Sequence, residues 1–272
     1  MIGITSETTA AGWGGRVREA ALLPASYAWA VQRAGCVPVV LAPVPWHAAS
    51  LAARLDGVLF SGGAAVGGRR SGIQSYGEAG PVDAARDEAE FALMHAAIAA
   101  GLPVLAICRG MQVLNAVRGG SAVEHPHGAA GQGRPGPGPA ERSARVVRIS
   151  PDSRLGRLLG PSITVPAEGL HQGVNRLGHG LTAVAWADDQ AVEAVELAGH
   201  PFTIGMRWHP EESGDMRVFE EFRATAARFA AARGAPGTAG GAGSTDGAGA
   251  GQAENKRKAR GARKARAGTA TT

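Results

Sequence analysis

The fold is decided by the stretch Leu102–Asn115, with the sequence LPVLAICRGMQVLN. Its first half is a short apolar run after a Gly-Leu-Pro turn, which is typical of a buried strand, and its second half changes to a helical period. Cys108 lies at the junction between the small residues Ala106 and Gly110, as a sharp strand-to-helix turn around a nucleophile requires. A helix N-terminus also favours a thiolate. Taken alone, the stretch fits a nucleophile and a small core cysteine about equally well.

Length and composition indicate a globular protein. The 272 residues are 44% hydrophobic, which is enough chain for a sizeable core. The two cysteines, Cys36 and Cys108, make a disulfide framework improbable. The chain begins with a strand-like run and shows neither a signal-peptide pattern nor 18 consecutive apolar residues. We therefore expect a soluble, cytoplasmic protein without a membrane partner.

The net charge of +5 belongs to the end of the chain. Seven Lys or Arg and two acidic residues follow Gly234, which leaves 21 basic and 21 acidic residues before it. Residues 234–272 are rich in Gly and Ala, then basic, and alanine is their main apolar residue. We expect a disordered tail after a folded domain at 1–233. A nucleic-acid-binding arm is the alternative, which we regard as less favoured than a solvated extension.

Strand-like and helical patterns alternate through the first half of the chain. The expected strands are at 1–5, 37–41, 56–60 and 102–107, and the expected helices at 16–34, 46–54 and 82–100. This alternation predicts an α/β fold with a mostly parallel sheet, whose ligands gather at the carboxyl ends of the strands. Residues 163–206 are β-rich, and a helix at about 214–232 closes the folded part.

Two loops and one helix carry further polar residues. Ser61-Gly62-Gly63 is most simply a flexible turn, although glycine also lets backbone N–H groups approach a reacting carbonyl. Residues 64–80 are expected to form a mobile loop beside a substrate pocket. On the helix at 82–100, we expect the charged residues Arg86, Asp87 and Glu90 to be solvated or paired within the helix.

Metal binding is not expected from this sequence. His125 and His127 lie in the Gly- and Pro-rich segment 125–144, which offers no supporting set of ligands.

A second motif, Trp208-His209-Pro210-Glu211, follows the expected strand at 202–206. A cysteine nucleophile needs a base, and that base needs an orienting partner. On an extended strand, His209 and Glu211 would point the same way, so that the carboxylate could reach the imidazole. Together with Cys108 about 100 residues upstream, this motif favours catalysis over a structural histidine.

The two motifs together resemble the class I glutamine amidotransferase superfamily, and more narrowly its γ-glutamyl-γ-aminobutyrate hydrolase branch. The resemblance runs from Met1 to about Arg233 and rests on Ile107–Gln112, Leu114-Asn115 and Trp208–Glu211. It implies a flavodoxin-like fold with a mostly parallel sheet and an added β-rich segment. It also implies hydrolysis of a small γ-glutamyl amine through a glutamyl-thioester, without a cofactor.

The resemblance assigns roles to individual residues. Cys108 would be the nucleophile, His209 the general acid and base, and Glu211 its orienting partner. The backbone N–H groups of Gly63 and Arg109 would form the oxyanion hole. The residues that would bind substrate are Gly62, Tyr76, Gln112, His171 and Gln172.

Some positions depart from the branch pattern and leave the amine half of the substrate open. Ala64–Gly67 replace an acidic residue and a proline, and Leu170 replaces the first histidine of a His-His-Gln motif. Two alternatives remain: a glutaminase subunit that passes ammonia to a partner synthetase, and a pseudo-enzyme that binds γ-glutamyl ligands. The partners we expect are a small-molecule substrate and, as an option, a second copy of the chain.

Overall fold

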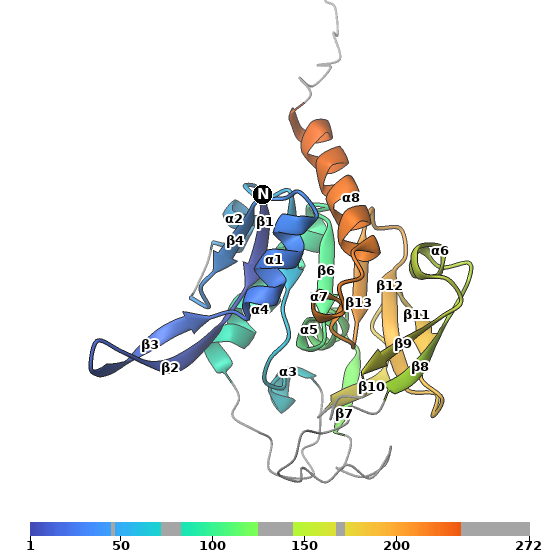
Figure 1. The fold of residues 1–272 in the computed structure, drawn as a ribbon, viewed down its shortest axis with the longest axis horizontal. Coiled ribbons are helices and arrows are strands. Elements are labelled where there is room, and N and C mark those ends of the chain that lie inside the picture. The colour runs from blue at the N-terminus through green and yellow to red at the C-terminus, as the bar shows by residue number, and fades with distance from the viewer. Residues whose placement is uncertain (45–46, 72–82, 125–143, 167–171, 235–272) are drawn as a thin grey trace, which may run out of the picture. The chain divides into compact units, whose positions relative to one another are not determined.

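The computed structural model describes residues 1–44, 47–71, 83–124, 144–166 and 172–234, and Figure 1 shows their arrangement. Within these residues, nine strands form one central sheet in the order β4-β1-β5-β6-β13-β12-β11-β8-β9. The class predicted from the sequence, an α/β protein with a mostly parallel sheet and an added β-rich segment, is therefore confirmed.

The first five strands of this order are parallel. They are β4 (Pro38–Leu41), β1 (Ile2–Thr5), β5 (Gly57–Phe60), β6 (Val104–Ile107) and β13 (Thr203–Met206). All four residues of β1, β5, β6 and β13 are buried, because helices cover both faces of the sheet. Such strands appear in the sequence as continuous apolar runs, which is why they were predictable.

The β-rich segment extends the same sheet with antiparallel strands. These are β12 (Val192–Leu197), β11 (Leu181–Trp186), β8 (Ala144–Ile149) and β9 (Ser162–Pro166). Next to the parallel strands, Ala194 of β12 pairs with Met206 of β13. Because β13 pairs parallel with β6, the carboxyl ends of these two strands lie next to each other.

Helices pack on both faces of the sheet. One face carries α1 (Ala25–Arg33), α6 (Arg154–Leu159) and α8 (Arg217–Gly234). The other carries α2 (Ala48–Ala52), α4 (Ala84–Ala99) and α5 (Arg109–Val117). Alternate residues of β5 and β6 join these two cores, with Leu59 and Leu105 on one side and Phe60 and Ala106 on the other.

The helix predicted at 16–34 is wrong in its first half. Residues Glu7–Trp13 (β2) and Arg16–Leu22 (β3) form an antiparallel hairpin that projects from the carboxyl end of β1 (Figure 1). Gly14 and Gly15 have φ of 60° and 73°, which a two-residue turn of this kind needs. The Gly-Gly pair between two seven-residue runs was the signal for this hairpin.

Several short elements were also missed. In the expected loop at 64–80, Gly68–Ser71 form the helix α3, and α6 was not predicted either. A second small sheet pairs β7 (Ser121–Glu124) with β10 (Gln172–Arg176). The predicted tail lies outside the described residues from 235 onward, as do His125 and His127.

Among the described residues, no helix is long and apolar enough to cross a membrane. The same residues contain no cluster of three or more His, Cys, Asp or Glu side chains that could hold a metal ion.

Candidate active site

Cys108 lies in the turn that joins β6 to α5. Its φ of 51° and ψ of −103° are unusual for a residue with a side chain, a strain that costs about 1–3 kcal/mol and is common at functional sites. The Cys108 N–H donates to the carbonyl of Met206 at 2.7 Å, which ties the turn to β13. A Cβ on Gly110 would lie 2.5 Å from the carbonyl oxygen of Phe60, so glycine is required here.

His209 lies just beyond β13 and precedes the short helix α7 (Pro210–Ser213). Its Nδ1 is 2.6 Å from Oε1 of Glu211, whose side chain is fully buried. The expectation that these two residues share an extended strand is wrong. Pro210 is the first residue of a helix, a position at which proline is favoured. The first turn of this helix brings the Glu211 carboxylate back to the imidazole ring.

The charge of His209 is set by its two partners. Burial lowers its pKa, but hydrogen bonds with Cys108 and Glu211 outweigh this and raise the pKa to about 11. The ring is therefore an imidazolium at neutral pH, in contact with the Cys108 sulfur on one side and the Glu211 carboxylate on the other. The structure thus brings the three residues of the predicted triad together.

Gly62 is wedged between these groups. A Cβ at this position would lie 2.7 Å from Cε1 of His209 and 3.5 Å from Cβ of Cys108. Its neighbour Gly63 has a φ of 141°, a conformation that side chains rarely adopt. The turn after β5 therefore needs glycine at both positions to pass this close to Cys108 and His209.

Arg86 holds this turn in place from α4. It is 2% exposed, and its Nη2 donates to the carbonyl oxygens of Ser61 and Gly62 at 3.3 and 2.9 Å. Its Nε donates to Glu90 at 2.9 Å. Of the two expectations for Arg86, Asp87 and Glu90, pairing within the helix is confirmed for Arg86 and Glu90, and solvation is wrong because all three are buried.

Arg109 completes this buried charge network. Its Nη2 lies 2.7 Å from Asp87 and 3.0 Å from Glu90, and its Nη1 donates to the carbonyl oxygen of Ala64 at 3.1 Å. The side chain thus fastens the start of α5 to α4, while the backbone N–H of Arg109 lies in the first turn of α5, where no intrahelical acceptor exists. The network joins the two turns that flank the candidate site.

Replacing Glu90 with glutamine is expected to lower the free energy of unfolding by about 3–5 kcal/mol, because Arg86 and Arg109 then stay buried with less negative charge. Urea denaturation measures this change. The exposed Glu88 on the same helix provides the control, since Glu88→Gln is expected to stay within about 0.5 kcal/mol of wild type. Equal effects of the two substitutions would contradict the structural role of the network.

Two of the predicted substrate-binding residues lie side by side. Nε2 of Gln112, on α5, donates to the backbone carbonyl of Gln172 at 3.4 Å, and Nε2 of Gln172 donates to that of Val66 at 3.1 Å. The side-chain carbonyl oxygens of both glutamines are buried and have no hydrogen-bond partner among the described residues. The other two predicted side chains, Tyr76 and His171, lie outside the described residues.

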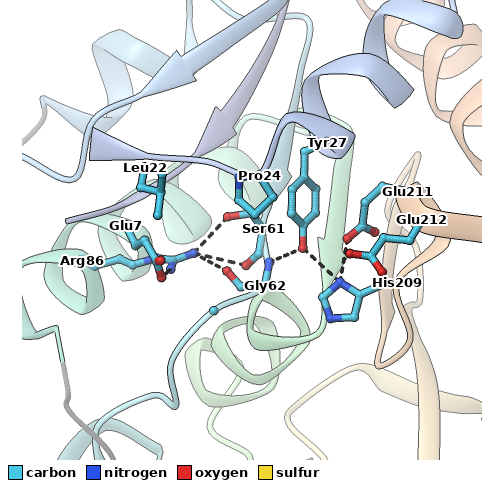
Figure 2. A pocket seen from close by; sticks show the side chains of 11 residues that line it. Glu7, Leu22, Pro24, Tyr27, Ser61, Gly62, Arg86, His209, Glu211 and Glu212 are labelled. Atoms are coloured by element: carbon cyan, nitrogen blue, oxygen red, sulfur yellow. Dashed lines mark hydrogen bonds and ion pairs between the residues drawn. The ribbon is translucent and has the colours of Figure 1, made fainter. Parts of the chain in front are cut away.

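Tyr27 was missed as a site residue. It lies on α1, and its hydroxyl accepts the N–H of Gly62 at 2.8 Å and lies 3.2 Å from Nδ1 of His209 (Figure 2). In the sequence it fits the apolar face of a helix, and nothing local separates it from a core aromatic. A small cavity of about 110 Å³ adjoins it, lined also by Glu7, Arg86 and Glu212.

Known proteins that are similar to this chain indicate its family. The Peptidase C26 family profile matches residues 1–211. Protein Rv2859c of Mycobacterium tuberculosis, described provisionally as a glutamine amidotransferase, is 34% identical over 215 residues, which cover 78% of this chain and 70% of that protein. The γ-glutamyl-γ-aminobutyrate hydrolase PuuD of Escherichia coli K12 is 31% identical over 205 residues, covering 70% and 78%.

A solved structure shows the same fold. It is a Thermoplasma acidophilum protein described provisionally as one component of a GMP synthase. The TM-score is 0.58 at 17% identity, with 86% of this chain and 97% of the other covered.

Proposed function

Because this chain belongs to the Peptidase C26 family, we propose that it is a cysteine-dependent hydrolase of γ-glutamyl amide bonds in small γ-glutamyl amines. The observation that carries the proposal is the contact of Cys108 with a charged His209 that is itself held by Glu211. A thiol, an acid–base group and an orienting carboxylate are the parts that acyl transfer requires.

The reaction begins at the sulfur of Cys108. An imidazolium beside the thiol favours the thiolate, which attacks the δ-carbonyl carbon of the γ-glutamyl group. The carbonyl oxygen becomes a tetrahedral oxyanion. We assign its stabilisation to the backbone N–H groups of Gly63 and Arg109, since the N–H of Gly62 already donates to Tyr27.

His209 then completes both halves of the reaction. The imidazolium gives its proton to the departing amine as the carbon–nitrogen bond breaks, which leaves a glutamyl-thioester on Cys108. The neutral ring next removes a proton from water, whose oxygen attacks the thioester and releases glutamate and the thiolate. Glu211 accepts the Nδ1–H throughout, so that the transferred proton leaves from and returns to the other ring nitrogen, Nε2.

The glutamyl half of the substrate has a suitable pair of acceptors. The side-chain carbonyl oxygens of Gln112 and Gln172, which are buried and have no hydrogen-bond partner within the described part of the chain, can accept N–H groups of a substrate α-ammonium. The name of the Escherichia coli relative, a γ-glutamyl-γ-aminobutyrate hydrolase, supports a γ-glutamyl amine as substrate. For the amine half, γ-aminobutyrate and a polyamine are the two candidates.

A panel of γ-glutamyl compounds tests this proposal. Purified protein is expected to release glutamate from γ-glutamyl-γ-aminobutyrate or γ-glutamylputrescine faster than from glutamine. The Mycobacterium tuberculosis relative, described as a glutamine amidotransferase, favours a second candidate, a glutaminase that supplies ammonia to a partner. Glutamine turnover that requires a co-purifying protein, with no hydrolysis of the other compounds, would establish that second candidate and contradict the first.

A further inference from the structure

The hydroxyl of Tyr27 lies where two separate parts of the candidate site meet. One part is the turn after β5, whose Gly62 N–H donates to the hydroxyl oxygen at 2.8 Å. The other is the acid–base pair, whose His209 Nδ1 lies 3.2 Å from the same oxygen and 2.6 Å from Glu211. One oxygen atom from α1 therefore connects groups that come from β5 and from α7 (Figure 2).

Tyr27 is well placed to hold the turn after β5 and His209 in fixed positions. The residue is 2% exposed, and its ring packs in the core that α1 shares with the sheet. Burial first, and the nearby Glu211 carboxylate second, raise the pKa of Tyr27 far above its usual value. The hydroxyl thus remains a neutral group with one proton to donate and lone pairs to accept. In the charged His209, Nδ1–H points to Glu211 as its nearer acceptor, with the tyrosine oxygen as the farther one.

We propose that Tyr27 is a positioning residue, whose hydroxyl holds the oxyanion turn and the acid–base histidine in a single arrangement. This inference rests on the proposed function. By accepting the Gly62 N–H, the hydroxyl orients the peptide that leads to Gly63, and by its contact with Nδ1 it restrains the imidazole ring. Both groups act on the transition state and not on substrate binding, so their loss affects kcat more than KM.

Tyr27→Phe removes the oxygen and keeps the ring. We expect kcat to fall about 10- to 100-fold, because a buried N–H loses its acceptor and the ring loses one restraint, while KM stays within about threefold. The matched control is Thr203→Val at the other end of β13, which removes a buried hydroxyl that lies 2.8 Å from His200 Nδ1. This control is expected to keep the wild-type kcat, and unfolding curves of both variants check that they fold.

A second measurement does not depend on the substrate. In protein labelled with ¹⁵N-histidine, the Nδ1–H resonance of His209 is identified by its loss in His209→Gln. Tyr27→Phe is expected to shift this resonance, and Thr203→Val is expected to leave it in place. Wild-type kcat in Tyr27→Phe together with an unmoved resonance would overturn the proposal. If the wild-type protein hydrolyses no γ-glutamyl compound, the proposed function fails, and the resonance alone then supports or overturns the role of Tyr27.

Discussion

Replacing Cys108 with alanine is expected to abolish hydrolysis of γ-glutamyl amides, with a fall in kcat of about a millionfold. In the proposed reaction the sulfur of Cys108 forms the covalent bond to the substrate, and alanine at the strained turn between β6 and α5 offers no nucleophile. Steady-state release of glutamate measures the effect.

The control for this experiment is the second cysteine, Cys36, which packs partly buried against the core that α1 shares with the sheet. Burial raises the pKa of the Cys36 thiol, which keeps it protonated and unreactive. Cys36→Ala is expected to keep the wild-type kcat. Turnover that persists in Cys108→Ala and disappears in Cys36→Ala would show that the nucleophile has been assigned to the wrong cysteine.

The second large effect is expected from Glu211→Gln, which should lower kcat by up to about 10⁴-fold, as the Asp→Asn replacement does in a Ser-His-Asp triad. An amide at this position can present its NH₂ group to Nδ1 and so favour the wrong tautomer of His209. The carboxylate is also one of the two groups that raise the pKa of His209 to about 11. Removing it lowers this pKa, so the ring loses its proton at a lower pH.

The pH dependence of kcat/KM tests whether Glu211 raises the pKa of His209. In the wild type, activity is expected to persist into the alkaline range and to decline only as pH approaches 11, where His209 loses the proton that the leaving amine needs. In Glu211→Gln, this decline should begin at a lower pH. The exposed Glu220→Gln on α8 is the control and should follow the wild-type profile. A Glu211→Gln profile that coincides with the wild type would exclude an electrostatic role for the carboxylate.

Much of the fold could be predicted because its strands are buried on both faces. The run Val104–Ile107 and the change of period after Cys108 are local signals, and so is the Gly119-Gly120 pair at the end of α5. The β2–β3 hairpin was not predicted, because the apolar residues of Arg16–Leu22 lie directly before those of α1 and look like part of the same helix. Periodicity alone does not separate the strand from the helix, whose boundary lies at Pro24, the N-cap of α1.

The reactive residues of the candidate site could be predicted from the sequence, but the residues that hold them in place could not. Cys108, His209 and Glu211 carry motifs that can be read locally, and the structure places them in contact. Arg86 was expected only to be solvated or paired within its helix, and Tyr27 carries no motif. Their positions depend on partners 24 and 182 residues away along the chain, Gly62 and His209, which only the folded sheet brings near. Charged residues on a helix are usually solvated, so nothing in the sequence indicated that Arg86 and Glu90 are buried. Their burial depends on the pairing of Glu90 with Arg109, which lies on another helix.

The central claim is a covalent glutamyl-thioester on Cys108. Wild-type protein mixed with a γ-glutamyl amine, quenched in acid within the first turnovers and digested, can be examined by mass spectrometry. We predict a glutamyl adduct on the peptide that contains Cys108, and no adduct in Cys108→Ala. Glutamate release without any adduct, and at an undiminished rate in Cys108→Ala, would contradict the account.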